Sequence, residues 1–195
     1  MTTGWKYARP VKEKLMRLEE PGKELPFDAD RGLVEEVTAR FNLASIIAQG
    51  LRGKGEPEVS RAMERLGKDL MDFTINLADT KYLDRTGEMI ERVFKQTGIS
   101  FPHRLQRYIE LSVLALRPSD RWNVTRSTTK EIVVEVSSCS VKKALEEAGI
   151  AGLPCKGFCL ASFQTAAAKT GDGVKIEVTK TLPQEGVCQF HIVKA

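Results

Sequence analysis

Three cysteines that lie close together in the sequence have the residue type and the spacing to do chemistry. Cys155 and Cys159 are four residues apart, and Cys139 comes shortly before them. Positions i and i+4 face the same side of a helix, so the thiols of Cys155 and Cys159 could share one ligand. Cys139 and Cys155 stand where helices should begin, and the partial positive charge of a helix N-terminus favours thiolate over thiol. All three are therefore candidates for nucleophiles or metal ligands.

The same cysteines could hold a metal ion. Their spacing, C-x15-C-x3-C, lacks the two close pairs typical of zinc fingers and zinc ribbons. Three cysteines would leave a fourth coordination position open for water, for a substrate or for a histidine. The candidate metal ligands are Cys139, Cys155, Cys159 and His191. The sequence does not identify a cofactor, and a zinc or iron ion held by the cysteines is the candidate that suits them.

A catalytic site would combine these thiols with positive groups that bind a substrate. The candidate catalytic residues are Cys155, Cys159 and Cys139. Arg126, on a predicted strand, could hold a carboxylate through two parallel hydrogen bonds, and Lys156 is the second candidate for substrate binding. Plainer alternatives stay open, because a buried cysteine behaves as a small hydrophobic residue and an arginine on a strand is often only exposed.

On the last predicted strand of the chain, a cysteine and a histidine are expected to face opposite sides of the sheet. Cys188, Phe190 and Ile192 alternate along it, which predicts that they share the face toward the core. His191 then falls on the opposite face. The chain contains two histidines, so a Cys/His catalytic pair would have to use His103 or His191.

The first part of the chain is predicted to be helical. Apolar residues that recur at steps of three and four predict these helices: one over residues 33–51, one over 57–77, one around 89–94 and one over 102–116. Pro57 suits the first turn of the second of them. Residues 8–20 are expected to form a further short helix.

After Pro118 the apolar residues recur at a step of two, which is typical of strands. Strands are expected around residues 122–124, 132–136, 174–178 and 188–192, with a helix capped by Ser140 that runs to Gly149 and another from Cys155 to Lys169. The expected fold class is α+β: an N-terminal helical region, residues 1–118, packs on a C-terminal β-β-α-α-β-β antiparallel sheet domain, residues 119–195. The two form separate domains or one integrated domain.

Composition narrows the class of protein. Hydrophobic residues make up 42% of the chain and charged residues 29%, values that are ordinary for a soluble protein. No apolar run approaches the roughly 20 residues of a membrane span, and the N-terminal sequence does not resemble a secretory signal, so we expect a cytoplasmic protein with reduced cysteines. The net charge of +4 is spread along the chain, which argues against a nucleic-acid partner. An apolar stripe over residues 59–77 permits a homodimer.

The second half of the chain resembles the family named for L-2-amino-thiazoline-4-carboxylic acid hydrolase. The resemblance rests on strand residues 123–126, a cysteine-led helix like 139–149, a Leu-Pro-Cys turn like 153–155 and a closing Cys-x-Phe strand like 188–190. The closing half also looks like the 4-vinyl reductase domain, an α+β fold that binds small molecules, through the stretch GVCQFHI. Both resemblances imply the same fold class.

The two resemblances imply different functions. The first implies a hydrolase that opens a C–N bond of a small cyclic, thiazoline-type carboxylate through a cysteine-lined site. The second implies a sensor or carrier domain that binds a small molecule or a metal without catalysis. The partner is in either case a small-molecule ligand or substrate.

Overall fold

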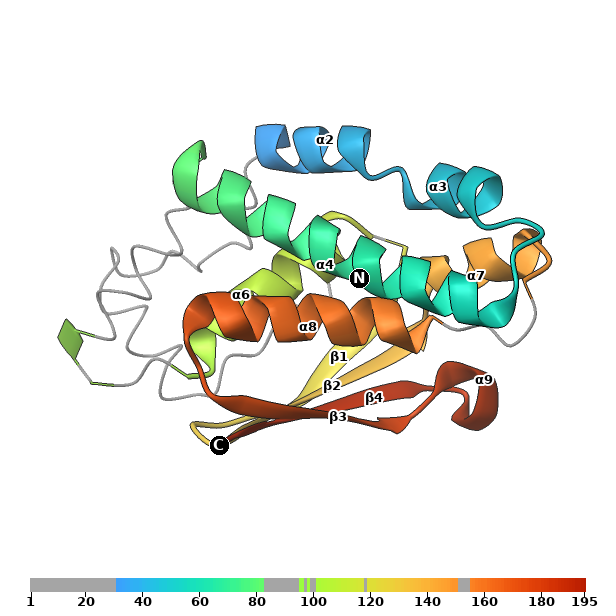
Figure 1. The fold of residues 1–195 in the computed structure, drawn as a ribbon. Coiled ribbons are helices and arrows are strands. Elements are labelled where there is room, and N and C mark those ends of the chain that lie inside the picture. The colour runs from blue at the N-terminus through green and yellow to red at the C-terminus, as the bar shows by residue number, and fades with distance from the viewer. Residues whose placement is uncertain (1–30, 83–94, 97, 99–100, 118, 151–154) are drawn as a thin grey trace.

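The fold is that of a computed structural model that describes residues 31–82, 95–96, 98, 101–117, 119–150 and 155–195 (Figure 1). The helices expected over residues 8–20 and around residues 89–94 lie outside the described residues. The chain is α+β, with helices that come before and between the strands of one antiparallel sheet.

The single helix expected over residues 33–51 is two helices. α2 spans Arg31–Arg40, and α3 spans Leu43–Gly50. The side chain of Asn42 accepts a hydrogen bond from the backbone N–H of Ser45 at 3.1 Å, which caps the start of α3. The apolar stripe survives this break, because Leu33, Val37, Ile47 and Leu51 are all buried. The prediction of one continuous helix was wrong, since periodicity does not reveal a cap inside a stripe.

Two later helical segments agree more closely with the sequence pattern. α4 spans Glu56–Thr80 with a proline in its first turn, and so confirms the helix predicted over residues 57–77. α6 spans His103–Glu110 and runs directly into a π-helical turn, η1, at Leu111–Ala115. The predicted helix over residues 102–116 is thus present, but its last part has the wider π turn.

The sheet has four antiparallel strands in the order β1-β2-β4-β3. Its strands are β1 Arg121–Ser127, β2 Glu131–Ser138, β3 Val174–Lys180 and β4 Cys188–Lys194. Between β2 and β3 lie α7, Ser140–Glu147, and α8, Lys156–Thr170. A short helix that the sequence did not predict, α9 at Leu182–Glu185, joins β3 to β4. The expected β-β-α-α-β-β order is confirmed.

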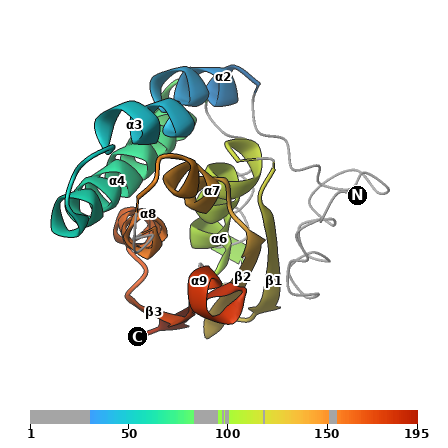
Figure 2. The ribbon, with the colours of Figure 1, turned by 90° about the vertical axis from the view of Figure 1, so that its right-hand side faces the viewer.

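The elements form layers (Figures 1 and 2). α8 lies on one face of the sheet, α4 crosses over α8, and α2 and α3 form the outermost layer. The contact between α4 and α8 is close because Gly67 lies against the backbone of Phe158, where a Cβ atom would come within 2.1 Å of the carbonyl oxygen. The Ser162 hydroxyl donates across the same contact to the Gly67 carbonyl at 3.0 Å.

Residues from both parts of the chain contribute to one hydrophobic core, which runs from Leu33 in α2 to Ile192 in β4. The other face of the sheet carries no helix of the described part of the chain (Figure 1). Among the described residues, none of the helices combines the length and the apolar character needed to cross a membrane.

Candidate functional site

The four cysteines of the chain line one small cavity between α7, α8 and the sheet. They are Cys139, Cys155, Cys159 and Cys188, and all four are free thiols. The remaining lining residues are Val136, Lys142, Lys156, Leu182 and Phe190. The cavity volume is about 10 Å³, which is close to the space needed by one water molecule. The site is therefore rich in sulfur and the size of a single small atom or ion.

Three of the four cysteines lie where a helix or a strand begins, and the fourth lies one turn into a helix. Cys139 follows β2 and is the residue at which α7 begins, and Cys155 is the corresponding residue of α8. Cys159 lies one turn into α8, and Cys188 is the first residue of β4. Cys139 is half-buried and the other three are buried. The structure thus brings together the three cysteines that sequence analysis singled out and adds Cys188 to them.

Burial keeps two of these thiols protonated. It raises the pKa of Cys155 to about 11, with further raising by the neighbouring sulfurs of Cys139 and Cys188. Burial also raises the pKa of Cys159 to about 12, although the positive charge of Arg117 opposes this effect. The thiolate form that the helix N-termini were expected to favour is outweighed by desolvation.

Arg117 is a site residue that sequence analysis missed. Its guanidinium is buried, acts on Cys159 through its charge and lies with its Cζ atom 5.4 Å from the ring centroid of Phe158. Burial disfavours its charge, but the charges of Cys159, Asp120 and Cys139 outweigh burial and raise its pKa. An arginine directly after the apolar residues 111–116 is the sequence signal that could have marked it.

Asp120 connects Arg117 to the helix that begins at Cys139. Its Oδ2 atom lies 3.4 Å from Nη1 of Arg117, and its Oδ1 atom accepts a hydrogen bond from the backbone N–H of Ser140 at 2.6 Å. The Asp120 side chain therefore caps α7, whereas the sequence had predicted that Ser140 would do so. Through Arg117 and Asp120, the position of Cys159 is tied to that of Cys139.

Cys188 receives its own hydrogen bond. The backbone N–H of Leu182, at the start of α9, donates to Sγ of Cys188 at 3.1 Å. Burial raises the pKa of Cys188, and this hydrogen bond partly opposes the rise. Sequence analysis predicted Cys188 as a core residue, which is confirmed by its burial next to Phe190, but its sulfur also faces the cavity.

Two lysines stand at the cavity. Lys142, on the first turn of α7, lowers the pKa of Cys155 through its charge, and its ammonium group also pairs with Glu146. Lys156 is exposed at the start of α8 and belongs to the lining as well. Among the described residues, no aspartate, glutamate or histidine belongs to the lining, although Glu185 lies near enough to Cys188 for its charge to raise the pKa of that thiol.

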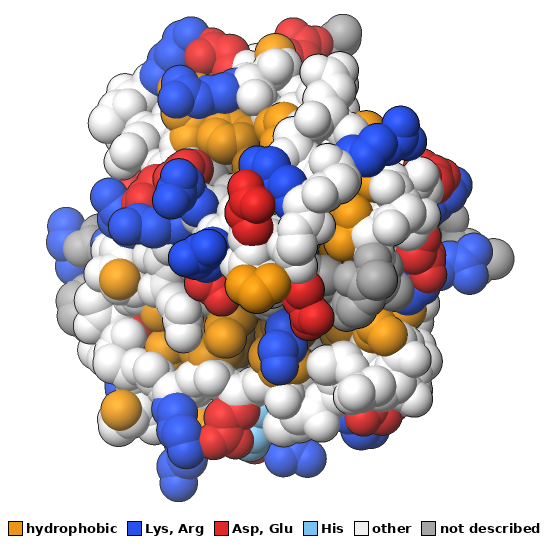
Figure 3. Space-filling model, turned by 45° about the vertical axis from the view of Figure 1, so that its right-hand side comes forward, with side chains coloured by type: hydrophobic (Ala, Val, Ile, Leu, Met, Phe, Trp, Pro, Cys, Tyr) orange, Lys and Arg blue, Asp and Glu red, His pale blue; other side chains and the backbone are white. Residues whose placement is uncertain are grey.

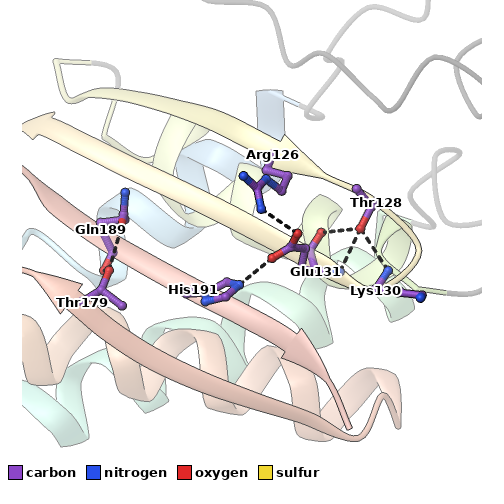
Figure 4. Close-up of polar contacts among 7 residues, drawn as sticks. All are labelled: Arg126, Thr128, Lys130, Glu131, Thr179, Gln189 and His191. Atoms are coloured by element: carbon purple, nitrogen blue, oxygen red, sulfur yellow. Dashed lines mark hydrogen bonds and ion pairs between the residues drawn. The ribbon is translucent and has the colours of Figure 1, made fainter.

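The remaining two candidates, Arg126 and His191, lie on the opposite face of the sheet (Figure 4). Nη1 of Arg126 is 2.9 Å from Oε1 of Glu131, and Nε2 of His191 is 2.6 Å from Oε2 of the same carboxylate. The Arg126 side chain is 62% exposed. The structure does not bring either residue to the cysteines, because strand alternation turns His191 away from Cys188 and Phe190.

The cysteine sulfurs do not have the spacing of a coordination shell. The described part of the chain includes no group of three or more His, Cys, Asp or Glu side chains whose arrangement could hold a metal ion. The four thiols therefore share a cavity without forming a finished coordination set.

Comparisons with known proteins find solved structures of low sequence identity and low structural similarity to this chain. No family model matches the chain, and no curated protein does. An oxygen-binding H-NOX domain related to soluble guanylate cyclases aligns at 13% identity over 96% of this chain and 86% of its own, with a TM-score of 0.38. A structure described as giving insights into H-NOX activation aligns at 13% over 96% and 88%, with a TM-score of 0.37. A point mutant of the T. tengcongensis H-NOX aligns at 8% over 84% and 93%, with a TM-score of 0.32.

Proposed function

We propose that this protein is a non-catalytic binding domain that holds a soft metal ion, zinc or iron, through the thiolates of Cys139, Cys155, Cys159 and Cys188. The observation that carries the proposal is that all four cysteines line one cavity with the volume of a single small ion. Four sulfur ligands suit tetrahedral zinc or iron. This is the binding function implied by the resemblance to the 4-vinyl reductase domain, with an ion in place of a larger ligand.

The surroundings of the thiols suit a site that becomes negatively charged. Four thiolates around a divalent ion carry a net charge of about −2. The buried guanidinium of Arg117 and the ammonium group of Lys142 lie where they would compensate that charge. The hydrogen bond from Leu182 to Cys188 is of the outer-shell kind that orients metal ligands.

Binding would require the thiols to lose their protons and close on the ion. The raised pKa values of Cys155 and Cys159 mean that these two thiols are neutral before an ion binds. An ion replaces those protons, so its affinity should rise steeply with pH and each bound ion should release protons. Because the described residues include no group of side chains arranged to hold a metal ion, the proposal also requires the four sulfurs to move together when the ion binds.

Hydrolysis of a cyclic thiazoline carboxylate has weaker support and stays a prediction from the family resemblance. A nucleophilic cysteine needs a thiolate, whereas burial raises the pKa of Cys155 and Cys159. A ring that bears a carboxylate is also many times larger than a cavity of about 10 Å³. Arg126, the candidate for binding that carboxylate, lies on the other face of the sheet.

The test is elemental analysis of protein purified without oxygen, together with a count of reactive thiols before and after chelation. We expect about one zinc or iron per chain and thiols that become reactive only after the ion is removed. The matched control is a Cys188→Ser variant, which should lose most of its metal and stay folded. Metal-free protein that also fails to take up zinc in vitro would overturn the proposal.

A further inference from the structure

β3 is an edge strand. The strand order places β1 and β3 at the two edges of the sheet, and β3 pairs only with β4 among the described residues. The outer backbone N–H and C=O groups of β3 are thus available to another strand.

The apolar side chains of β3 are incompletely covered. Val174, Ile176 and Val178 alternate along the strand on the face toward the helices, and all three are only half-buried. On neighbouring β4, the corresponding residues Phe190 and Ile192 are buried. α8 therefore covers β4 better than it covers β3. The side of the molecule drawn in Figure 3 has hydrophobic side chains exposed among the charged ones.

The sequence of β3 is complementary to itself when two copies run antiparallel with Ile176 opposite Ile176. In this register Val174 lies opposite Val178 of the second copy, and Lys175 lies opposite Glu177 of the second copy. Opposite residues of an antiparallel pair share one face of the sheet, so the apolar residues meet on the helix side and the charges on the other.

Neighbouring registers are worse. Centring the pair on Glu177 places two carboxylates opposite each other, and centring it on Lys175 does the same with two ammonium groups. A shift of one residue in a single strand would place apolar side chains of one copy beside charged residues of the other. The register centred on Ile176 is the one in which charge and hydrophobicity both match.

We propose that two copies of this chain associate through β3, antiparallel and centred on Ile176, so that their four-stranded sheets form one continuous sheet. Lys175 and Glu177 already pair within one strand at 2.6 Å, and both are exposed. In the dimer, Lys175 and Glu177 of the two copies form one network of charges along the interface. No residue of β3 lines the cysteine cavity, so the proposal does not depend on what that cavity binds.

The experiment uses charge reversal and sedimentation equilibrium of the full chain. The unmodified chain should dimerise at micromolar to submillimolar concentration. Lys175→Glu places a glutamate opposite Glu177 of the second copy, and Glu177→Lys places a lysine opposite Lys175, so each variant alone should dimerise at least about tenfold more weakly.

Mixing the two variants tests charge complementarity across the interface between the two copies. Both lack the ion pair within the strand, yet every charge of one is complementary to the opposite charge of the other. The mixture should therefore form a heterodimer with affinity close to that of the unmodified chain. Circular dichroism of each variant checks that the monomer is folded. A monomeric unmodified chain, single variants that dimerise normally, or a mixture that stays monomeric would each overturn the proposal.

Discussion

The guanidinium of Arg117 lies near the thiol of Cys159 in the interior of the protein, where its charge opposes the burial that raises the pKa of that thiol. The same guanidinium pairs with Asp120, whose side chain is completely buried. A buried charge without a partner is costly, so losing either member of this pair alone should destabilise the fold. The pair also fixes Cys159 relative to the start of α7, and it thereby contributes to the shape of the cysteine cavity.

Replacing Arg117 with leucine should destabilise the protein by about 3–5 kcal/mol, because Asp120 is then left buried without its cation. Urea unfolding followed by circular dichroism measures the change. The control adds Asp120→Asn to Arg117→Leu, which removes the orphaned charge and should restore part of the loss. A loss below about 1 kcal/mol would mean that the pair is more hydrated than its burial indicates.

Gly67 should tolerate no side chain. A Cβ atom there would meet the carbonyl oxygen of Phe158 at 2.1 Å, which is backbone and cannot easily move. Gly67→Ala should therefore force α4 and α8 apart and cost about 1–3 kcal/mol or more in the free energy of unfolding. Gly50→Ala is the matched control, since no atom lies within 4 Å of a Cβ there and alanine favours the helix. Equal effects of the two substitutions would contradict the close helix contact.

The metal-free protein should lose stability at alkaline pH. The pKa of Cys155 is about 11 in the folded chain against 9.0 for a free thiol, so the folded state holds its proton more tightly than the unfolded state does. This contribution is complete below pH 9.0, and as the pH rises through the range up to the folded pKa about 2–3 kcal/mol is lost. Thermal unfolding between these pH values should show a shallower decline for Cys155→Ala. An unchanged slope would contradict the raised pKa.

The helical and strand periods predicted most of the fold because they record local burial. The steps of three and four over residues 57–77 correspond to α4, and the alternation of Cys188, Phe190 and Ile192 corresponds to the core face of β4. The helix start capped by Asn42 was not predicted, because the apolar stripe continues on both sides of it. α9 was not predicted, because it is a single helical turn inside a short connection between strands.

The sequence could predict only those site residues that lie close to one another along the chain. Cys155 stands at the N-cap of α8 and Cys159 lies one turn into it, so their proximity could be predicted from spacing alone. Arg117 and Cys188 join them through tertiary contacts between segments far apart in the sequence, which no local pattern reports. His191 could be placed on the outer face by alternation, and the structure puts it there beside Glu131.

The outer face of the sheet should be irrelevant to the cavity. His191→Gln and Arg126→Gln should each leave the zinc dissociation constant within about twofold, since these side chains bind Glu131 on the other side of the sheet. Cys188→Ser, by contrast, should weaken zinc binding by at least about tenfold. Competition with a chromophoric chelator measures all three. Weaker binding by the His191 variant would place a histidine among the ligands and contradict the geometry.

The most direct test of a four-cysteine ion site is titration of the metal-free, reduced protein with cadmium, followed by ultraviolet absorption. Sulfur-to-cadmium charge transfer reports thiolate ligands and grows with their number. We predict saturation at one cadmium per chain, with the intensity of four thiolates in the unmodified protein and of three in Cys139→Ser, Cys155→Ser, Cys159→Ser or Cys188→Ser. Absence of the charge-transfer band, or a band that these four substitutions leave unchanged, would contradict the account.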